Sequence, residues 1–307
     1  MGGGHYNVHS EPPIELTFLD RYLAKAQHDA TQLAKKRGLE EPPLIDIHYF
    51  TELSSKIGMD LSACLCAFGT LGAGNHFIEV NEDPQDGKYF VTVHSGSRAF
   101  GMKLFQYHNK KVNHNEKCLL GENSIEYCYD LIVAQHLAVM NRHIMLQLIL
   151  RELDVEFHDD RIIESIHNYI DFALANESID GKEPSYGNEV NILRKGAISA
   201  KTDELCIVAL NMRDGILICR GKGHPDWNYS CAHGCGRIMS RAEARRRIKI
   251  KEYRKTMEDV VSTSVGVETL DEAPQAYKDM NVIVDALGPS VHIETHLRAV
   301  INLKGGE

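Results

Sequence analysis

Residues 75–94 read Asn-His-Phe-Ile-Glu-Val-Asn-Glu-Asp-Pro-Gln-Asp-Gly-Lys-Tyr-Phe-Val-Thr-Val-His, which is the clearest β-hairpin pattern in the sequence. Segments 75–80 and 89–94 are apolar and rich in β-branched or aromatic residues, and turn formers lie between them. This pattern predicts two antiparallel strands joined by a long loop. His76 and His94 fall at the strand ends away from the loop. Because neighbouring strands lie about 4.8 Å apart, we expect the two imidazoles to be close enough to share a metal ion.

The rest of the chain mixes helical and strand patterns. Helices are expected at residues 15–37, 124–153, 241–256 and 274–286, and residues 155–175 are expected to be a strand or loop leading into a helix around His167. Residues 204–221 predict two short strands across a turn at 213–215. Because strands and helices do not alternate regularly, the predicted fold class is α+β. We expect a single domain over residues 1–307, with a flexible start at residues 1–13.

Composition excludes several classes of protein. Of the 307 residues, 43% are hydrophobic and 25% are charged, as in an ordinary globular protein. No apolar run approaches the roughly 18 residues that span a bilayer, and the first residues carry no secretory signal pattern. We therefore expect a cytoplasmic protein with no membrane partner. The eight cysteines lack the spacings of zinc sites and are expected to be reduced thiols.

The charge distribution is uneven. The net charge of −9 argues against a protein that coats nucleic acid. Arg237–Lys255 nevertheless contains nine basic residues. Such a run usually forms a solvated helix face. Its position directly after a candidate nucleophile favours contact with a phosphate backbone.

The segment His233-Gly-Cys-Gly-Arg-Ile-Met-Ser-Arg241 carries the strongest indication of chemistry. Glycine lets a bulky ligand approach the backbone, and backbone amides there can hold an oxyanion. Arg237 and Arg241 supply planar forks for phosphate. His233 is therefore a candidate nucleophile or acid–base group facing a phosphoryl group, with an ordinary turn histidine as the alternative.

Three further histidines lie in unusual surroundings: His76, His94 and His167. Imidazole binds borderline divalent metals such as manganese, iron and zinc. Each histidine alone is typical of a hydrogen-bonded core or turn position. Together with His233, we interpret the four as one site.

Eleven segments, in order along the chain, form a larger pattern. They are residues 69–79, 94–98, 141–142, 167–168, 194–197, 211–215, 220–223, 225–230, 233–241, 271–278 and 302–305. In this order they resemble the RtcB family of RNA-splicing ligases. The resemblance implies an RtcB-like mixed fold, in which β-hairpins and packed helices surround a central metal and nucleotide cleft.

The resemblance implies a GTP- and manganese-dependent RNA ligase that acts in tRNA splicing or RNA repair. In such a ligase a histidine carries GMP and passes it to an RNA 3′-phosphate, often formed from a 2′,3′-cyclic phosphate. A 5′-hydroxyl end then attacks and GMP leaves. By motif position, His233 would carry the GMP, and the metal ligands would be His76, His94 and His167. The guanylate pocket would be lined by Asn75, Glu79, Asn168, Asn211, Met212, Gly234, Gly236, Tyr277 and Lys304.

One element of the family pattern is not found. The family carries Asp-x-x-Cys-Gly-Met, whose aspartate and cysteine complete the metal cluster, and the nearest segment here is Asp60-Leu-Ser-Ala-Cys64 with a different spacing. We therefore expect that the N-terminal part of the family domain is missing. Three alternatives stay open: an active ligase, an impaired member that binds guanylate or RNA without ligating, and a metal-dependent phosphohydrolase. The subunit number and the need for an activating accessory protein also stay open.

Three local patterns give further expectations. Gly69-x-x-Gly-x-Gly74 resembles a dinucleotide loop, but a strand rather than a helix is predicted after it. His292-Ile-Glu-Thr-His296 would put two imidazoles one helical turn apart, but an exposed polar turn is expected there instead. Glu79 follows His76 by three residues, so we expect the two on opposite faces of a strand unless the strand bends.

Overall fold

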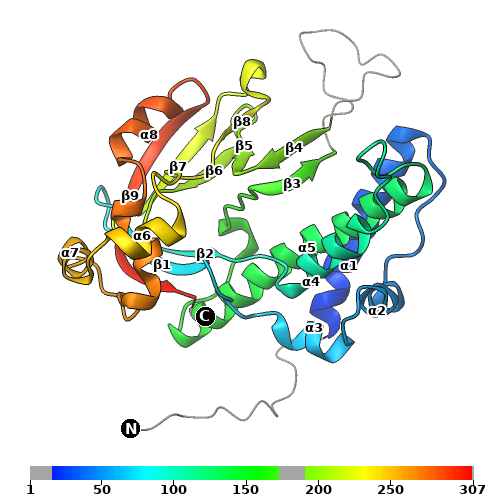
Figure 1. The fold of residues 1–307 in the computed structure, drawn as a ribbon, viewed down its shortest axis with the longest axis horizontal. Coiled ribbons are helices and arrows are strands. Elements are labelled where there is room, and N and C mark those ends of the chain that lie inside the picture. The colour runs from blue at the N-terminus through cyan, green and yellow to red at the C-terminus, as the bar shows by residue number, and fades with distance from the viewer. Residues whose placement is uncertain (1–15, 173–190, 306–307) are drawn as a thin grey trace. The chain divides into compact units, whose positions relative to one another are not determined.

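The chain folds into helices and antiparallel sheets, which confirms the α+β class (Figure 1). The computed structural model describes residues 16–172 and 191–305, so the expected flexible start at 1–13 lies outside the described residues. The chain divides into two compact units, one of residues 1–70 and 95–157 and one of residues 71–94 and 158–307. The single ligase domain stays a prediction.

The first unit is helical. Its helices are α1 (Leu16–Arg37), α2 (Ile47–Lys56), α3 (Leu61–Ala67), α4 (Ala99–Asn109) and α5 (Glu122–Glu152). α5 packs along α1 and also contacts α4. α1 and α5 confirm two predicted helices, and α1 ends in a basic turn before Gly38, whose φ of 58° closes the helix. No helix among the described residues is both long and apolar enough to cross a membrane.

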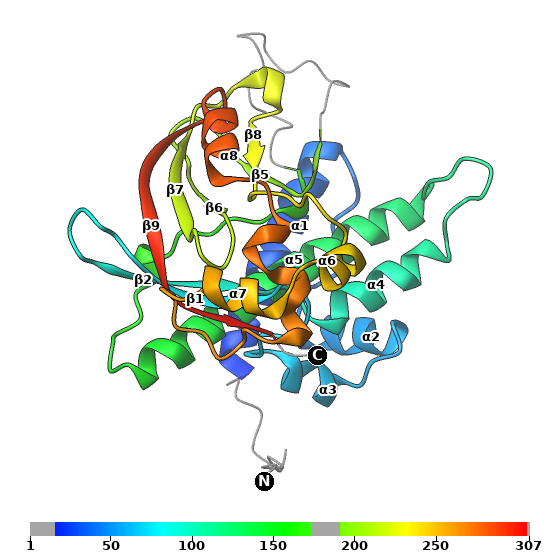
Figure 2. The same cartoon turned by 60° about the vertical axis from the view of Figure 1, so that its left-hand side comes forward.

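The second unit is built on a five-stranded antiparallel sheet with the order β2-β1-β9-β7-β6. Its strands are β1 (Phe77–Glu82), β2 (Tyr89–His94), β6 (Leu205–Ala209), β7 (Ile216–Gly221) and β9 (Val291–Lys304). The hairpins β1–β2 and β6–β7 confirm the predictions for residues 75–94 and 204–221. Figure 2 shows β9 beside both hairpins, which it joins into one sheet.

Shorter elements complete this unit. Two further antiparallel pairs are β3 (Asn168–Asp171) with β4 (Ile192–Lys195), and β5 (Ala197–Ser199) with β8 (Ser230–Ala232). The helices are α6 (Arg241–Arg247), α7 (Ile250–Thr256) and α8 (Met280–Leu287). Single 3₁₀ turns are η1 (Asp159–Arg161), η3 (Pro225–Trp227), η4 (Val267–Glu272) and η5 (Pro274–Ala276).

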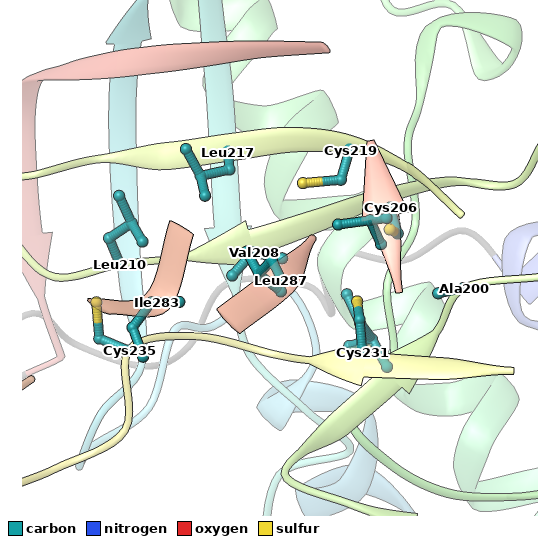
Figure 3. Packing of buried hydrophobic residues seen from close by; sticks show 12 residues of the cluster. Ala200, Cys206, Val208, Leu210, Leu217, Cys219, Cys231, Cys235, Ile283 and Leu287 are labelled. Atoms are coloured by element: carbon teal, nitrogen blue, oxygen red, sulfur yellow. The ribbon is translucent and has the colours of Figure 1, made fainter. Parts of the chain in front are cut away.

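An apolar core connects β6, β7 and β8 with α8 (Figure 3). Four of the eight cysteines lie in it: Cys206, Cys219, Cys231 and Cys235. All eight cysteines are free of disulfides, as predicted. Burial raises the pKa of the Cys235 thiol to about 11. This thiol is therefore a core group rather than a reactive one at neutral pH.

The prediction of a helix around His167 is wrong. His167 precedes strand β3, which pairs with β4, so that Tyr169 lies opposite Arg194. The prediction of an exposed turn at His292–His296 is also wrong, because this segment belongs to β9 and pairs with β7. In both cases a distant strand supplies the backbone hydrogen bonds, and local sequence patterns do not report such a partner.

The two helices predicted at 241–256 and 274–286 are interrupted. Ile248, 7% exposed, has an extended backbone (ψ 130°) between α6 and α7 because its side chain joins an apolar core cluster. In the second segment, η5 is followed by extended Tyr277 before α8 begins at Met280. Burial of an apolar side chain outweighs helix continuity at Ile248.

Candidate active site

Four imidazoles from distant parts of the sequence form a row in the second unit. The ring centroids are 5.7 Å apart for His76 and His94, 5.1 Å for His94 and His167, and 4.9 Å for His167 and His233. The register of the hairpin places His94 opposite Phe77, next to His76, while His167 precedes β3 and His233 follows β8. The four histidines interpreted as one site are neighbours, and we call them the imidazole row.

Backbone carbonyls orient the two end rings of the row. His76 Nδ1 lies 2.8 Å from the carbonyl oxygen of Leu71, and His233 Nδ1 lies 2.7 Å from that of Gly196. Because a carbonyl oxygen only accepts, Nδ1 carries the proton in both rings. The neutral ring then has its lone pair on Nε2, which is the nitrogen able to bind a metal or attack phosphorus.

The donor chemistry of the row suits a borderline divalent ion such as manganese, since imidazole nitrogens bind such ions. Within residues 16–172 and 191–305, however, no three His, Cys, Asp or Glu side chains converge on one point as they stand. The ring planes of His94 and His167 are 17° apart and those of His167 and His233 are 29° apart, so these rings are stacked, whereas His76 and His94 are tilted by 48°. The metal-ligand roles of His76, His94 and His167 stay predictions.

In the segment Asp60–Cys64, both Asp60 and Cys64 make structural contacts within the helical unit. Asp60 caps α3 by accepting a hydrogen bond from the Ala63 amide at 3.1 Å. Cys64 is 1% exposed, and its thiol donates to Ser54 Oγ at 3.7 Å. Burial raises the pKa of this thiol. A buried protonated thiol is a poor metal ligand.

Asp271 and Glu272 are two buried carboxylates of η4, and we call them the acidic pair. They lie in the same unit as the imidazole row, and each pairs with cationic side chains. Each is 2% exposed. Glu272 lies 3.3 Å from Arg237 and 3.1 Å from Lys304, and it accepts a hydrogen bond from the Tyr277 hydroxyl at 2.8 Å. Burial and the neighbouring Glu272 raise the pKa of Tyr277. Two residues of the predicted guanylate pocket, Tyr277 and Lys304, are thereby brought together.

Asp271 anchors the start of the basic run. Its two oxygens lie 2.7 Å from Arg241 and 3.2 Å from Arg245. These arginine side chains are 46% and 43% exposed, yet the guanidinium of each is paired with Asp271. The first residues of the run are therefore fixed by the acidic pair, and they are not simply a solvated face.

Phe77 connects Lys304 with the imidazole row. Its ring stacks on His94 with centroids 5.3 Å apart and planes 12° apart. The ammonium of Lys304 lies 4.9 Å from the centre of the same ring, since Lys304 is opposite Phe77 in the β1–β9 register. A cation over an aromatic face is attracted by the ring. A predicted guanylate residue and a predicted metal ligand thus share one aromatic neighbour.

Glu79 is a buried acidic residue of the site whose pKa is raised. It lies on the same face of β1 as Phe77 and Asn81, and it is opposite Asn302 on β9. Its carboxylate accepts hydrogen bonds from Asn81, at 2.6 Å, and from Asn302. Burial raises the pKa of Glu79 to about 7, although both amides and the charge of Lys304 act in the opposite direction.

The remaining predicted pocket residues lie in varied positions. Asn75 is exposed, and Asn168 accepts a hydrogen bond from the Gly196 amide at 3.3 Å, next to the partner of His233. Asn211 closes the β6–β7 turn, and Met212 is 1% exposed in a core cluster. For Asn211 and Met212, the position in the motif supports a role.

Gly234 and Gly236, which follow His233, are required to be glycine for different structural reasons. A Cβ on Gly234 would lie 2.3 Å from the Ala209 carbonyl oxygen, so a larger residue does not fit there. Gly236 has a φ of 66°, which a residue with a Cβ rarely adopts. The segment around His233 is therefore held close to β6 and then turns sharply.

Sequence reasoning missed three features of the site: the Gly196 carbonyl, the acidic pair and Phe77. Backbone groups leave no mark in a sequence, so the first could not be found. The dipeptide Asp271-Glu272 directly before Ala273-Pro274 was a usable signal, because two adjacent acidic residues in an apolar setting need cationic partners.

Several known proteins of similar sequence are splicing ligases by name. RNA-splicing ligase RtcB of Escherichia coli (strain K12) is 30% identical over 260 residues, which cover 77% of this chain and 61% of that protein. The tRNA-splicing ligase RtcB of Archaeoglobus fulgidus is 25% identical over 271 residues, covering 71% of this chain and 55% of that protein. The chain thus spans between 55% and 61% of the length of these two curated relatives.

A family model described as "tRNA-splicing ligase RtcB" matches residues 55–305, which is most of the chain. The chain therefore belongs to the RtcB family. The match includes the whole imidazole row and the acidic pair.

Proposed function

We propose that this chain is an RNA ligase that uses GTP and manganese to join an RNA 3′-phosphate or 2′,3′-cyclic phosphate end to a 5′-hydroxyl end. The observation that carries the proposal is the hydrogen bond from His233 Nδ1 to the Gly196 carbonyl oxygen, 2.7 Å long. It leaves the lone pair of the ring on Nε2, and a neutral, oriented imidazole is the nucleophile that a phosphoramidate requires.

In the proposed first step, Nε2 of His233 attacks the α-phosphorus of GTP. A P–N bond forms, the P–O bond to the β-phosphate breaks, and pyrophosphate leaves. An oxygen of the RNA 3′-phosphate then attacks the same phosphorus and takes the GMP, which frees His233. Finally the 5′-hydroxyl loses its proton and its oxygen attacks the activated RNA phosphorus; the bond from this phosphorus to the bridging oxygen breaks, and GMP leaves with that oxygen. A 2′,3′-cyclic phosphate end enters this sequence after one water has broken its 2′ P–O bond to give the 3′-phosphate.

The charged groups of the site support this assignment. His76, His94 and His167 are proposed to hold manganese, which when bound supplies positive charge to phosphate oxygens. Arg237 and Lys304 share the carboxylate of Glu272 and carry fixed positive charge in the same unit as His233. Of the residues proposed for the guanylate pocket, Tyr277 and Lys304 have the clearest support because both contact Glu272.

Incubation with GTP labelled at the α-phosphate, in the presence of manganese, tests the proposal. After denaturing electrophoresis, we expect label on the wild-type chain and none on His233→Ala. His292→Ala is the matched control, since His292 is an exposed histidine of the same unit on β9, and its labelling should equal that of the wild type. Nucleotide binding without label would instead support a binding-only protein. Phosphate release without strand joining would support a phosphohydrolase.

A further inference from the structure

Trp227 is a large aromatic side chain presented to solvent close to the candidate nucleophile in sequence. It is the only tryptophan of the chain, and it is 54% exposed. It ends the turn η3 in the loop between β7 and β8, and β8 leads directly to His233. Six residues span at most ~20 Å, so the Cα atoms of Trp227 and His233 lie within that distance of each other.

The backbone behind Trp227 is held in an unfavourable conformation. Asn228 and Tyr229 both have a φ of 50°, in the left-handed region that side chains with a Cβ disfavour. Two consecutive non-glycine residues in this region persist only where the surroundings hold them. Such backbone strain is typical of binding and catalytic loops.

Arg194 supplies the restraint. Its side chain is 2% exposed, and its guanidinium donates to the carbonyl oxygens of Asn228 and Tyr229 at 3.5 and 3.2 Å. It also donates to Ser230 Oγ at 2.9 Å, while its other end is paired with Asp171 at 2.8 Å. A buried arginine fully used in this way fixes the loop. The loop that carries the indole therefore needs little further ordering when a ligand covers the ring.

We propose that Trp227 is a stacking platform for an unpaired base of the RNA strand whose 3′-phosphate end reacts at His233. The inference rests on the proposed function for the identity of the strand. An exposed aromatic face on a restrained loop that leads to the reacting group suits single-stranded nucleic acid recognition, because every base has a face that can stack. Stacking of one base corresponds to about 5- to 150-fold in affinity.

Intrinsic fluorescence tests this directly, because all tryptophan emission comes from Trp227. We expect single-stranded RNA with a 3′-phosphate to quench the emission with saturation. The same RNA in a duplex with paired ends should leave it nearly unchanged. In binding measured with labelled RNA, Trp227→Ala should weaken affinity about 10-fold or more, while Trp227→Phe retains most of it. The matched control is Tyr89→Ala, an aromatic residue of the same unit that is 65% exposed, which should bind as the wild type does.

Three results would overturn the platform. One is RNA binding without any change in emission, and another is wild-type affinity in a folded Trp227→Ala chain. The third is quenching by GTP alone to which RNA adds nothing, since guanine would then be the stacked base. Quenching by RNA in a chain that never becomes labelled by GTP would support the platform while rejecting the ligase. Labelling without quenching would reject the platform and leave the ligase.

Discussion

Two histidines, one in each unit, are held in opposite ways. His108 in α4 is 2% exposed and contacts Asp130 through Nε2 at 2.8 Å, while the Tyr49 hydroxyl donates to the same carboxylate at 2.5 Å. His233 is only partly buried and is held through Nδ1 by the Gly196 carbonyl oxygen. The first arrangement uses Nε2 for an internal hydrogen bond to a carboxylate that connects three helices. The second leaves Nε2 available to a substrate.

The comparison separates a histidine fixed by a buried carboxylate from the proposed nucleophile, which is fixed by a backbone carbonyl oxygen. A carboxylate brings a charge that must itself be compensated in the interior. A carbonyl oxygen fixes the tautomer and adds no net charge. A histidine held by a carbonyl through one nitrogen is therefore preorganised for chemistry at the other.

The same substitution, histidine to asparagine, can be made at His233 and at His108, and the largest expected effect is on the labelling of the His233 variant. His233→Asn should reduce formation of the GMP adduct at least ~10³-fold, because no other group replaces the nucleophile. It should change the free energy of unfolding by less than about 1 kcal/mol, because the side chain is not part of a core. Labelling with GTP and urea denaturation measure the two quantities. Labelling of the His233→Asn chain would show that His233 is not the nucleophile.

The converse is expected for His108→Asn. Removing one partner of a buried pair should lower the free energy of unfolding by about 3–5 kcal/mol, with labelling of the folded chain unchanged. Denaturation of the variant measures the loss. His136→Asn is the control, because its partner Asp29 is 54% exposed and such pairs contribute less than about 1 kcal/mol. Equal losses for the two variants would show that burial of the pair is unimportant.

Glu79 extends the comparison to a buried acid and predicts a pH dependence. Its folded pKa of about 7 lies above the ordinary 4.5, so the folded chain binds the proton more tightly than the unfolded chain. Its contribution to stability is therefore complete below about pH 4 and is lost as pH rises to about 7, on the order of 3 kcal/mol in total. Glu79→Gln should flatten this part of the stability profile between pH 5 and 8. An unchanged profile would mean that another group titrates.

The smallest effect is expected from Gly196→Ala, which tests the carbonyl that holds His233. Gly196 has a φ of 67°, and an added Cβ would lie 3.5 Å from the His233 ring, an ordinary contact. Backbone strain should cost about 1 kcal/mol of stability, and labelling should slow because the carbonyl shifts. Gly87→Ala in the β1–β2 loop, with a φ of 70° and open space around the added Cβ, should cost a similar stability but leave the rate of labelling unchanged. Equal rates in both variants would show that the carbonyl does not control His233.

Local patterns predicted the hairpins and the long helices because the partners are near in sequence. The β1–β2 strands and helix α5 are examples. The grouping of the four histidines was also predicted, from residue type and motif order. What could not be predicted depends on distant backbone: the strand after His167 pairs with residues 192–195, and the tautomer of His233 depends on a carbonyl 37 residues away. The pairing of Glu272 with Lys304 likewise requires the folded sheet to bring them together.

Strand β9 has a consequence for how the protein is made. It is the last strand of the sheet to leave the ribosome, yet it lies between the two hairpins, β1–β2 and β6–β7. During synthesis the hairpins have no common partner, and each presents an open edge until β9 arrives. Lys304 is delivered to Phe77 by the same strand. A nascent chain stalled before residue 291 would thus expose two unpaired strand edges and lack the cation over the Phe77 ring, so premature termination should favour aggregation.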